Sequence, residues 1–465
     1  MRRSITVWFA ALAGLVILTV AADALRYRRA VHGYDVTRDQ DFNFSRAKVR
    51  RIPVELHGGR LVVPGRPEPH DAVFLRLRVR STPLGSWLEP RLQITAGDRT
   101  VTQAFERGGR GVRYVNLGPL VSNRPVPVVL AGQNLEIADQ RATVLYVAND
   151  WHPRSQTILV ISPHPDDAEI AAYNLYAGRN AYVLTVTAGE AGDAGMFAKF
   201  AGATAFREKG RERVWNSLVV PMLGGLSPER TANLGYFDGT LASMRAKPNV
   251  AVHSLYSGAL SLDAYRQTLA QGLIPARPGG LATWSNLVQD LEYVVARVKP
   301  DVIVTPYPRL DAHPDHELST FALIEALKDL NWKTGSLLLY TNHLTVSEMY
   351  PYGDAGDLVS LPPGVDGITF DGIVSDSLSP AAQARKYLAL DAMVDLRPPS
   401  RPDSVSDTAR AAGHALSMAL FSDDRSYFRR AVRANELFFE VRVSSLYQPG
   451  ITEDIEGRTP PPSTE

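Results

Sequence analysis

The stretch from Thr157 to Glu169 reads Thr-Ile-Leu-Val-Ile-Ser-Pro-His-Pro-Asp-Asp-Ala-Glu and decides the fold of the longer part of the chain. Residues 158–161 are a continuous apolar run, which is typical of a strand buried on both faces of a parallel sheet. A helical pattern follows from Ala168 to Tyr176. A strand that passes through a polar turn into a helix is the repeating unit of α/β folds.

The same alternation continues towards the C-terminus. The sequence predicts further strands over 181–186, 301–305 and 336–340, and helices over 206–218, 287–298 and 317–330. This order indicates an α/β domain over 151–448, with a Rossmann-like, mostly parallel sheet and helices on both faces. Ligands of such sheets bind beyond the carboxyl ends of the strands, so the residues that follow each strand are the candidates for a site.

The part before this domain has a different pattern. Apolar and polar residues alternate with period two over 73–80, 92–95, 112–115, 126–130 and 142–147. Short alternating runs separated by Gly, Pro and Asn predict a β-sandwich-like accessory domain over 29–150. Arg76, Arg78 and Arg80 take every second position of one run. We expect them on a solvated sheet face, which serves either for solubility alone or for binding an anionic glycan or lipid head group.

Composition narrows the possible chemistry. The chain has 465 residues, of which 45% are hydrophobic and 21% charged, so whole-chain disorder and collagen-like structure are excluded. It has no cysteine, which excludes disulfide scaffolds, Cys-ligated zinc, iron–sulfur clusters and thiol nucleophiles. The net charge of +1 is a cancellation, because Arg2 and Arg3 carry +2, residues 23–154 carry +8 and the later residues carry −9. A basic N-terminal part therefore precedes an acidic one.

Both ends of the chain have a distinct composition. Arg2 and Arg3 precede an uncharged, largely apolar run from Ser4 to Ala22, which predicts a signal peptide or membrane anchor over 1–28. We therefore expect an extracytoplasmic protein, either secreted or periplasmic, or anchored in a membrane if the segment is not cleaved. The tail over 449–465, with three successive prolines, is expected to be disordered.

Two strand ends carry matching polar clusters. The first cluster spans Ser162 to Glu169 and the second spans Arg309 to His316. Each follows a predicted strand and opens a predicted helix, so both lie at the same sheet edge. Asp and Pro are also common at helix starts for structural reasons, and either cluster alone would be weak evidence. Two such clusters at one edge favour a functional site.

These residues can build a metal site without cysteine. A catalytic zinc ion takes three protein ligands, and imidazoles with one carboxylate suit it. We expect His164, Asp167 and His316 as the ligands. Asp166 is then left beside the metal as a candidate general base. His313 is a candidate for stabilising an oxyanion and protonating a leaving amine, provided that Asp315 or Asp311 keeps its imidazole charged.

With these residues, the sequence resembles the PIG-L (LmbE-like) family of zinc-dependent N-deacetylases. Pro163 to Ile170 is similar to the family's first motif, and His313 to His316 is similar to its later one. Three further stretches resemble family segments: Thr187–Gly192, Leu234–Gly239 with Phe237 in place of Pro, and Lys299–Pro306. The resemblance covers about residues 155–440.

The resemblance implies a function and a role for each matching residue. His164, Asp167 and His316 fall on the family's zinc ligands and Asp166 on its general base. His313 falls on its oxyanion-stabilising acid, with Asp315 as partner. The reaction implied is removal of the N-acetyl group from an acetamido sugar of a glycan or glycolipid by zinc-activated water. Zn²⁺ is the expected cofactor, although another divalent metal would suit the ligands, and no nucleic-acid partner is expected.

The sequence also departs from the family. Ala171 and Ala172 stand where glycines are common. The stretch from Lys247 to Gly280 is long and is a candidate lid or wall over the pocket. Arg207, Asp238 and His343 are candidate substrate contacts, with structural or surface roles as the alternative.

Two other functions stay open at this stage. One is a zinc amidase or esterase that acts on a non-sugar substrate. The other is a non-catalytic glycan-binding protein, which the full set of ligands, base and acid argues against. A serine hydrolase is disfavoured because the chain lacks a Gly-x-Ser-x-Gly elbow.

Overall fold

The computed structural model describes residues 32–266, 273–274, 280–397, 424 and 426–457. The predicted signal or anchor segment over 1–28 lies outside these residues. Among the helices that the structure describes, none combines the length and the apolar character needed to cross a membrane.

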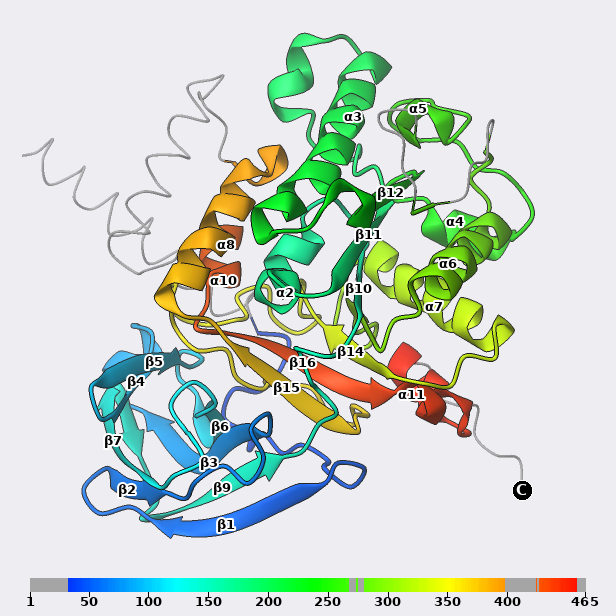
Figure 1. The fold of residues 1–465 in the computed structure, drawn as a ribbon. Coiled ribbons are helices and arrows are strands. Elements are labelled where there is room, and N and C mark those ends of the chain that lie inside the picture. The colour runs from blue at the N-terminus through cyan, green and yellow to red at the C-terminus, as the bar shows by residue number, and fades with distance from the viewer. Residues whose placement is uncertain (1–31, 267–272, 275–279, 398–423, 425, 458–465) are drawn as a thin grey trace, which may run out of the picture.

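Two antiparallel sheets form the N-terminal part (Figure 1). One runs in the order β1 (Val49–Glu55), β9 (Arg141–Val147), β3 (Ala72–Ser81) and β6 (Arg110–Asn116), with β8 (Leu135–Ile137) paired to β3. The other runs in the order β2 (Arg60–Val63), β7 (Val126–Gln133), β4 (Arg91–Ala96) and β5 (Arg99–Ala104). A short 3-10 helix, η1 (Leu84–Ser86), follows β3. Two facing antiparallel sheets are the architecture that the period-two pattern predicts.

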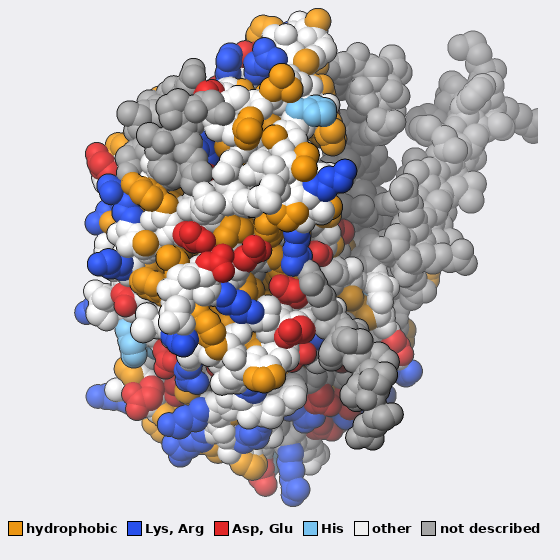
Figure 2. Space-filling model, turned by 90° about the vertical axis from the view of Figure 1, so that its right-hand side faces the viewer, with side chains coloured by type: hydrophobic (Ala, Val, Ile, Leu, Met, Phe, Trp, Pro, Cys, Tyr) orange, Lys and Arg blue, Asp and Glu red, His pale blue; other side chains and the backbone are white. Residues whose placement is uncertain are grey.

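The outward face of β3 is only partly solvated. Alternation along β3 directs Val73, Leu75, Leu77 and Val79 into the sandwich core, whereas Phe74, on the other face, packs against the α/β part. The arginines of that face pair with acids: Arg76 with Asp41 at 2.9 Å, Arg78 with Asp39 at 2.8 Å and Arg80 with Glu136 at 2.5 Å. Figure 2 likewise shows acidic and basic side chains interspersed on one face of the molecule. The paired arginines favour the solubility role over an anion-binding one.

A seven-stranded mixed sheet forms the centre of the α/β part. Its order is β12 (Thr231–Tyr236), β11 (Ala181–Thr187), β10 (Ile158–Ser162), β13 (Val302–Pro306), β14 (Ser336–Tyr340), β16 (Asn435–Arg442) and β15 (Gly372–Ser377). The first five strands are mutually parallel, and β16 is antiparallel to both of its neighbours. The strands predicted over 181–186, 301–305 and 336–340 are confirmed, whereas β12, β15 and β16 were not predicted.

Helices cover both faces of this sheet (Figure 1). Leu159 and Ile161 face α6 (Trp284–Val298) and α7 (Pro314–Asp329), whereas Ile158 and Val160 face α2 (Asp167–Tyr176) and α8 (Pro380–Ala392). The remaining helices are α3 (Ala203–Val219), α4 (Leu241–Ala246), α5 (Asp263–Arg266), α10 (Tyr427–Ala431) and α11 (Ile451–Glu456). The 3-10 turns are η2 (Gly195–Lys199), η3 (Val220–Gly224), η4 (Pro228–Arg230), η5 (Val394–Leu396) and η6 (Val443–Tyr447).

The prediction of a disordered tail from residue 449 is wrong for its first part. Gly450 and Gly457 have left-handed backbone conformations that bound α11, and the side chain of Ile455 between them is fully buried. The prediction failed because it rested on the proline-rich composition of the last residues, whereas α11 precedes the prolines. Pro460 to Pro462 lie outside the described residues.

A kink in α2 ties this helix to the C-terminal strand. Ala172 has a non-helical backbone, which frees the N–H groups of Asn174 and Leu175 from the helix. Both donate to the carboxylate of Glu436 on β16, at 2.9 and 3.0 Å. Lys386 of α8 neutralises the same carboxylate at 2.7 Å. The helix that opens at the first polar cluster is thereby fixed from two sides.

Candidate metal centre

The two polar clusters meet at the carboxyl ends of β10 and β13. These strands are neighbours in the sheet, and the chain continues from β10 to β11 on the other side, so the sheet order reverses here. Ser162 holds the first turn, because its hydroxyl donates to the carbonyl of His164 and accepts from the N–H of Ala168. A reversal of strand order opens a crevice at the strand ends, and the site lies in it.

The three predicted ligands converge on one point. His164 Nδ1 lies 3.2 Å from His316 Nε2, and Asp167 Oδ2 lies 3.3 Å from the first nitrogen and 3.1 Å from the second. All three side chains are buried. A tetrahedral zinc ion with bonds of about 2.0–2.1 Å places its ligand atoms roughly 3.3 Å apart. The residues present therefore fit a zinc ion, and the same donor types also suit other divalent metals.

Carboxylates face the far sides of both imidazoles. Asp311 Oδ1 lies 3.2 Å from Nδ1 of His316, and Asp238 Oδ1 and Asp315 Oδ2 lie 3.3 and 3.6 Å from Nε2 of His164. A carboxylate behind a ligand imidazole fixes its orientation and tautomer. His164 also belongs to two other groups of three residues whose atoms lie close enough to hold a metal, one with His313 and His316 and one with Asp238 and Asp315.

The excess of negative charge shows in the pKa values of the ligands. Burial lowers the pKa of His316, yet Asp167 and Asp311 raise it to about 10. Burial likewise opposes charge on His164, but Asp238 and the neighbouring acids raise its pKa well above 6.5. The pKa of Asp167 falls well below 3.8 because the two imidazoles outweigh its burial. A site that stabilises positive charge this strongly is suited to a divalent cation.

Asp166 lies beside the cluster and has its own partner. Its Oδ2 accepts a hydrogen bond from Arg213 Nη2 at 2.8 Å, and Arg213 Nη1 donates to the carbonyl of Gly189. Burial raises the pKa of Asp166 although Arg213 opposes the shift. Arg213 also lies 3.2 Å from Asp395. No sequence pattern singled out Arg213, because its role depends on how α3 packs beside β12.

His313 caps the start of α7 as a neutral imidazole. Its ring lies 4.6 Å from the ring of His164, and its Nδ1 accepts from the N–H of Asp315 at 3.3 Å. Burial and the two neighbouring imidazoles lower the pKa of His313 to about 4. The neighbouring carboxylate of Asp315 acts in the opposite direction on this pKa and does not offset the lowering. The Asp315 carboxylate accepts from the N–H of Gly239, and the Asp311 carboxylate accepts from the backbone N–H groups of His313 and Asn342.

The predicted substrate contacts have different positions. Asp238 reaches the cluster through His164, and its Oδ2 accepts from Ala191. His343 lies with its ring 5.3 Å from that of His316 and 5.9 Å from that of His313. Arg207 instead donates to the carbonyl of Ser257 at 3.1 Å. The structure therefore brings two of the three candidates to the cluster, and ties Arg207 to the long stretch after Lys247.

That long stretch is fastened to the site through Glu190. The Glu190 carboxylate is fully buried and accepts from Ser254 Oγ at 2.7 Å and from the N–H of Asp238 at 3.2 Å. The hydroxyl of Tyr265 donates to Ser257 Oγ, and the N–H of Ser257 donates to Ser254 Oγ, so Tyr265 joins the same series of hydrogen bonds. The described part of the stretch thus packs beside the loop that carries Asp238. Arg277 of this stretch lies outside the described residues.

Comparison with known families agrees with this geometry. Residues 159–327 match the family model described as PIG-L, GlcNAc-PI de-N-acetylase. This stretch is a PIG-L domain. It contains all three proposed ligands, Asp166 and His313, whereas the loop after β14 and the C-terminal strands lie beyond the PIG-L match. No curated protein matches the chain.

Solved structures show only distant likeness to the chain that carries this PIG-L domain. GalB, the 4-carboxy-2-hydroxymuconate hydratase from Pseudomonas putida KT2440, is 15% identical, with 62% of this chain and 96% of that chain covered and a TM-score of 0.28. The acetyl xylan esterase Est2A from Butyrivibrio proteoclasticus is 11% identical, with 66% and 85% covered and a TM-score of 0.17. Scores this low support no conclusion about fold or function.

Proposed function

We propose that this protein is a metal-dependent hydrolase that removes the N-acetyl group from an acetamido sugar of a glycan or glycolipid. The observation that carries the proposal is the convergence of His164 Nδ1, Asp167 Oδ2 and His316 Nε2 within 3.1–3.3 Å inside a PIG-L domain. These ligands would hold a zinc ion, which supplies Lewis acidity for the amide carbonyl and lowers the pKa of water.

The chain's own residues account for the movement of the proton. Asp166 is the proposed general base that takes a proton from the attacking water, and its raised pKa brings its basicity closer to that of a base working near neutral pH. Arg213 fixes the rotation of that carboxylate through Oδ2. After attack, Asp166 holds the proton that the departing sugar nitrogen needs. The general base and the later proton donor are then the same group.

His313 is the proposed donor to the developing oxyanion. Its Nδ1 accepts from a backbone N–H, so the neutral ring carries its proton on Nε2. A neutral N–H directed at an oxyanion stabilises it by a hydrogen bond without first taking up a proton. This assignment differs from a charged imidazole that protonates the leaving amine.

Export or membrane attachment is proposed on the N-terminal sequence alone. The basic start and the apolar run from Ser4 to Ala22 support it. Fractionation of cells that produce the full chain, with N-terminal sequencing of the product, tests it. Soluble cytosolic protein with an intact Met1 would contradict the proposal.

Acetate release from a panel of N-acetylated amino sugars tests the activity. The zinc-loaded chain should release acetate, and Asp166→Asn should lower kcat by about 100-fold or more, as expected for loss of a general base. Asp98→Asn, at an exposed position of the accessory part, is the matched control and should leave kcat unchanged. Acetate release from simple amides or esters, but from no N-acetylated sugar, would instead support an amidase or esterase that acts on non-sugar substrates.

A further inference from the structure

The loop that follows β14 reaches the metal cluster from outside the PIG-L match. Asn342 in this loop is buried, and its Nδ2 donates to Asp167 Oδ1 at 2.7 Å. The other oxygen, Oδ2, is the one that faces His164 and His316. Asn342 therefore occupies Oδ1 of the ligand carboxylate, whereas Oδ2, which also accepts from the backbone N–H of His164 at 2.9 Å, is the oxygen directed at the two imidazoles.

The backbone of the same residue supports a second ligand. The N–H of Asn342 donates to Asp311 Oδ2 at 2.9 Å, and Oδ1 of that carboxylate lies 3.2 Å from His316 Nδ1. The side chain and the backbone of one residue thus act on two of the three ligands. A shift of this loop would disturb both at once.

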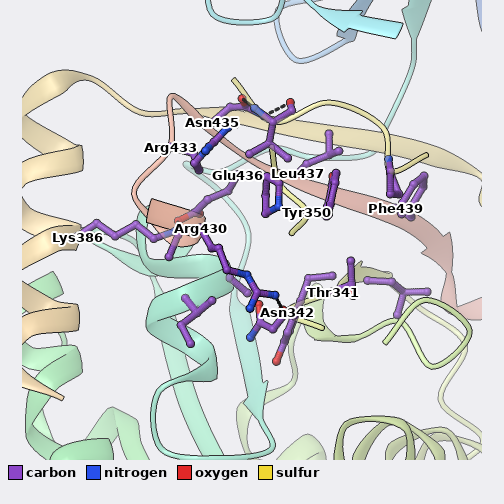
Figure 3. Close-up of a pocket in the computed structure, with 18 residues that line it drawn as sticks. Thr341, Asn342, Tyr350, Lys386, Arg430, Arg433, Asn435, Glu436, Leu437 and Phe439 are labelled. Carbon is purple, nitrogen blue, oxygen red and sulfur yellow. Dashed lines mark hydrogen bonds and ion pairs between the residues drawn. The ribbon is translucent and has the colours of Figure 1, made fainter. Parts of the chain in front are cut away.

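Asn342 is itself held by the C-terminal part of the chain. Arg430 on α10 donates through Nη2 to the carbonyl oxygen of Asn342. Figure 3 shows the Arg430 side chain directed from its helix towards the loop that carries Asn342. Arg430 is buried, and its Nη1 lies 3.7 Å from Glu348. A segment distant in sequence therefore completes the support of the metal cluster.

We infer that Asn342 is a positioning residue that holds Asp167 as a one-oxygen metal ligand and sets the affinity of the site. This inference rests on the proposed function, because it assumes a metal at the cluster. Outer partners of metal ligands typically change metal affinity by about 10- to 100-fold when they are removed. The same range is expected for loss of the Asn342 amide.

The test is zinc affinity, measured on the full chain by competition with a chelating dye. Asn342→Ala and Asn342→Asp should each bind zinc about 10- to 100-fold more weakly than the wild type. The aspartate variant keeps the size of the side chain and the backbone contacts, so it serves if the alanine variant does not fold. Asn174→Ala is the matched control, since it removes an Asn-to-carboxylate bond of 2.8 Å to Asp376, away from the ligands. It should bind zinc as the wild type does.

A second measurement separates positioning from a general structural role. The visible absorption of cobalt(II) is stronger in four-coordinate than in higher-coordinate sites, so it reports whether Asp167 binds through one oxygen or two. The Asn342 variants should show a weakened and shifted cobalt spectrum, and Asn174→Ala should not.

Folded Asn342 variants that match the wild type in zinc affinity and cobalt spectrum would overturn the inference. That result would leave the proposed function intact if the wild type still releases acetate. A wild-type protein that binds no zinc would contradict both the role inferred for Asn342 and the proposed metal-dependent function.

Discussion

Replacing Arg213 by methionine is the perturbation that best separates the proposed catalytic arrangement from simple packing. Arg213 is buried on α3 and contacts Asp166 at 2.8 Å, the carbonyl of Gly189 at 2.9 Å and Asp395 at 3.2 Å. Methionine keeps most of the apolar volume and removes the charge and both hydrogen bonds. Asp166 then stays buried without its guanidinium partner.

The magnitude follows from these contacts. Removing one partner of a buried ion pair costs about 3–5 kcal/mol. Asp395 is more than a third exposed and adds little. Burial already raises the pKa of Asp166, so this carboxylate can take up a proton and limit the loss. We therefore expect the free energy of unfolding to fall by about 3 kcal/mol, the lower end of the range.

Urea denaturation at neutral pH measures this loss, and steady-state acetate release measures its effect on catalysis. Arg211→Met on the same helix is the control, because its side chain is half exposed and pairs only with Glu208. That change should cost less than about 0.5 kcal/mol and leave kcat unaltered. Equal stability and equal kcat in the two variants would show that the Arg213–Asp166 pair contributes neither to stability nor to catalysis.

Three further predictions concern buried residues outside the metal cluster. Burial raises the pKa of Glu440 from 4.5 to about 7. The contribution of the protonated Glu440 to stability is therefore complete below pH 4.5 and is lost as the pH rises towards 7. Glu440→Gln should flatten the fall in the free energy of unfolding over that pH window, and an unchanged dependence on pH would contradict this. Lys386→Met leaves Glu436 buried with only two backbone donors and should cost about 3 kcal/mol in urea denaturation, whereas a loss below 1 kcal/mol would show that these donors suffice. A Cβ at Gly210 would lie 2.5 Å from Cε1 of Tyr265, so Gly210→Ala should cost about 1–3 kcal/mol in thermal denaturation and displace the stretch that holds Ser254; an unchanged midpoint would speak against that packing.

The sequence predicted the parts of the site that follow the strands. The apolar run after Thr157 and the polar residues beyond it placed His164 and Asp167 at a strand end, and the second cluster placed His316 at the neighbouring one. Strand order could not be read from the chain, but the carboxyl ends of parallel strands share an edge whatever their order. Convergence of the three residues was therefore predictable.

The groups that support the ligands were not predicted. Arg213 and Arg430 act through helix packing, which leaves no local signal in the sequence. Asn342 did leave one, because it follows a predicted strand at the same edge, yet only its neighbour His343 was selected, as a histidine. Asp311 was considered as a partner of the His313 imidazole, whereas its carboxylate faces the ring of His316 and meets His313 at the backbone N–H. The choice between two imidazoles in one helical turn depends on side-chain geometry.

The long stretch after Lys247 shows a different limit. Its length indicated a lid or wall, but the structure buries Tyr265 against Gly210 and links it through Ser257 and Ser254 to Glu190. Such a series of hydrogen bonds joins residues that are far apart in sequence, and no fixed sequence spacing marks them. It becomes visible only in the folded structure.

The central claim is that His164, Asp167 and His316 hold a metal ion on which sugar deacetylation depends. The most direct test measures bound zinc per chain and acetate release in the same preparations of the wild type, His164→Ala and the exposed-site control His57→Ala. We expect one zinc ion per chain and acetate release for the wild type and the control, with both lost in His164→Ala. A folded His164→Ala protein that keeps its zinc and releases acetate at the wild-type rate would contradict it.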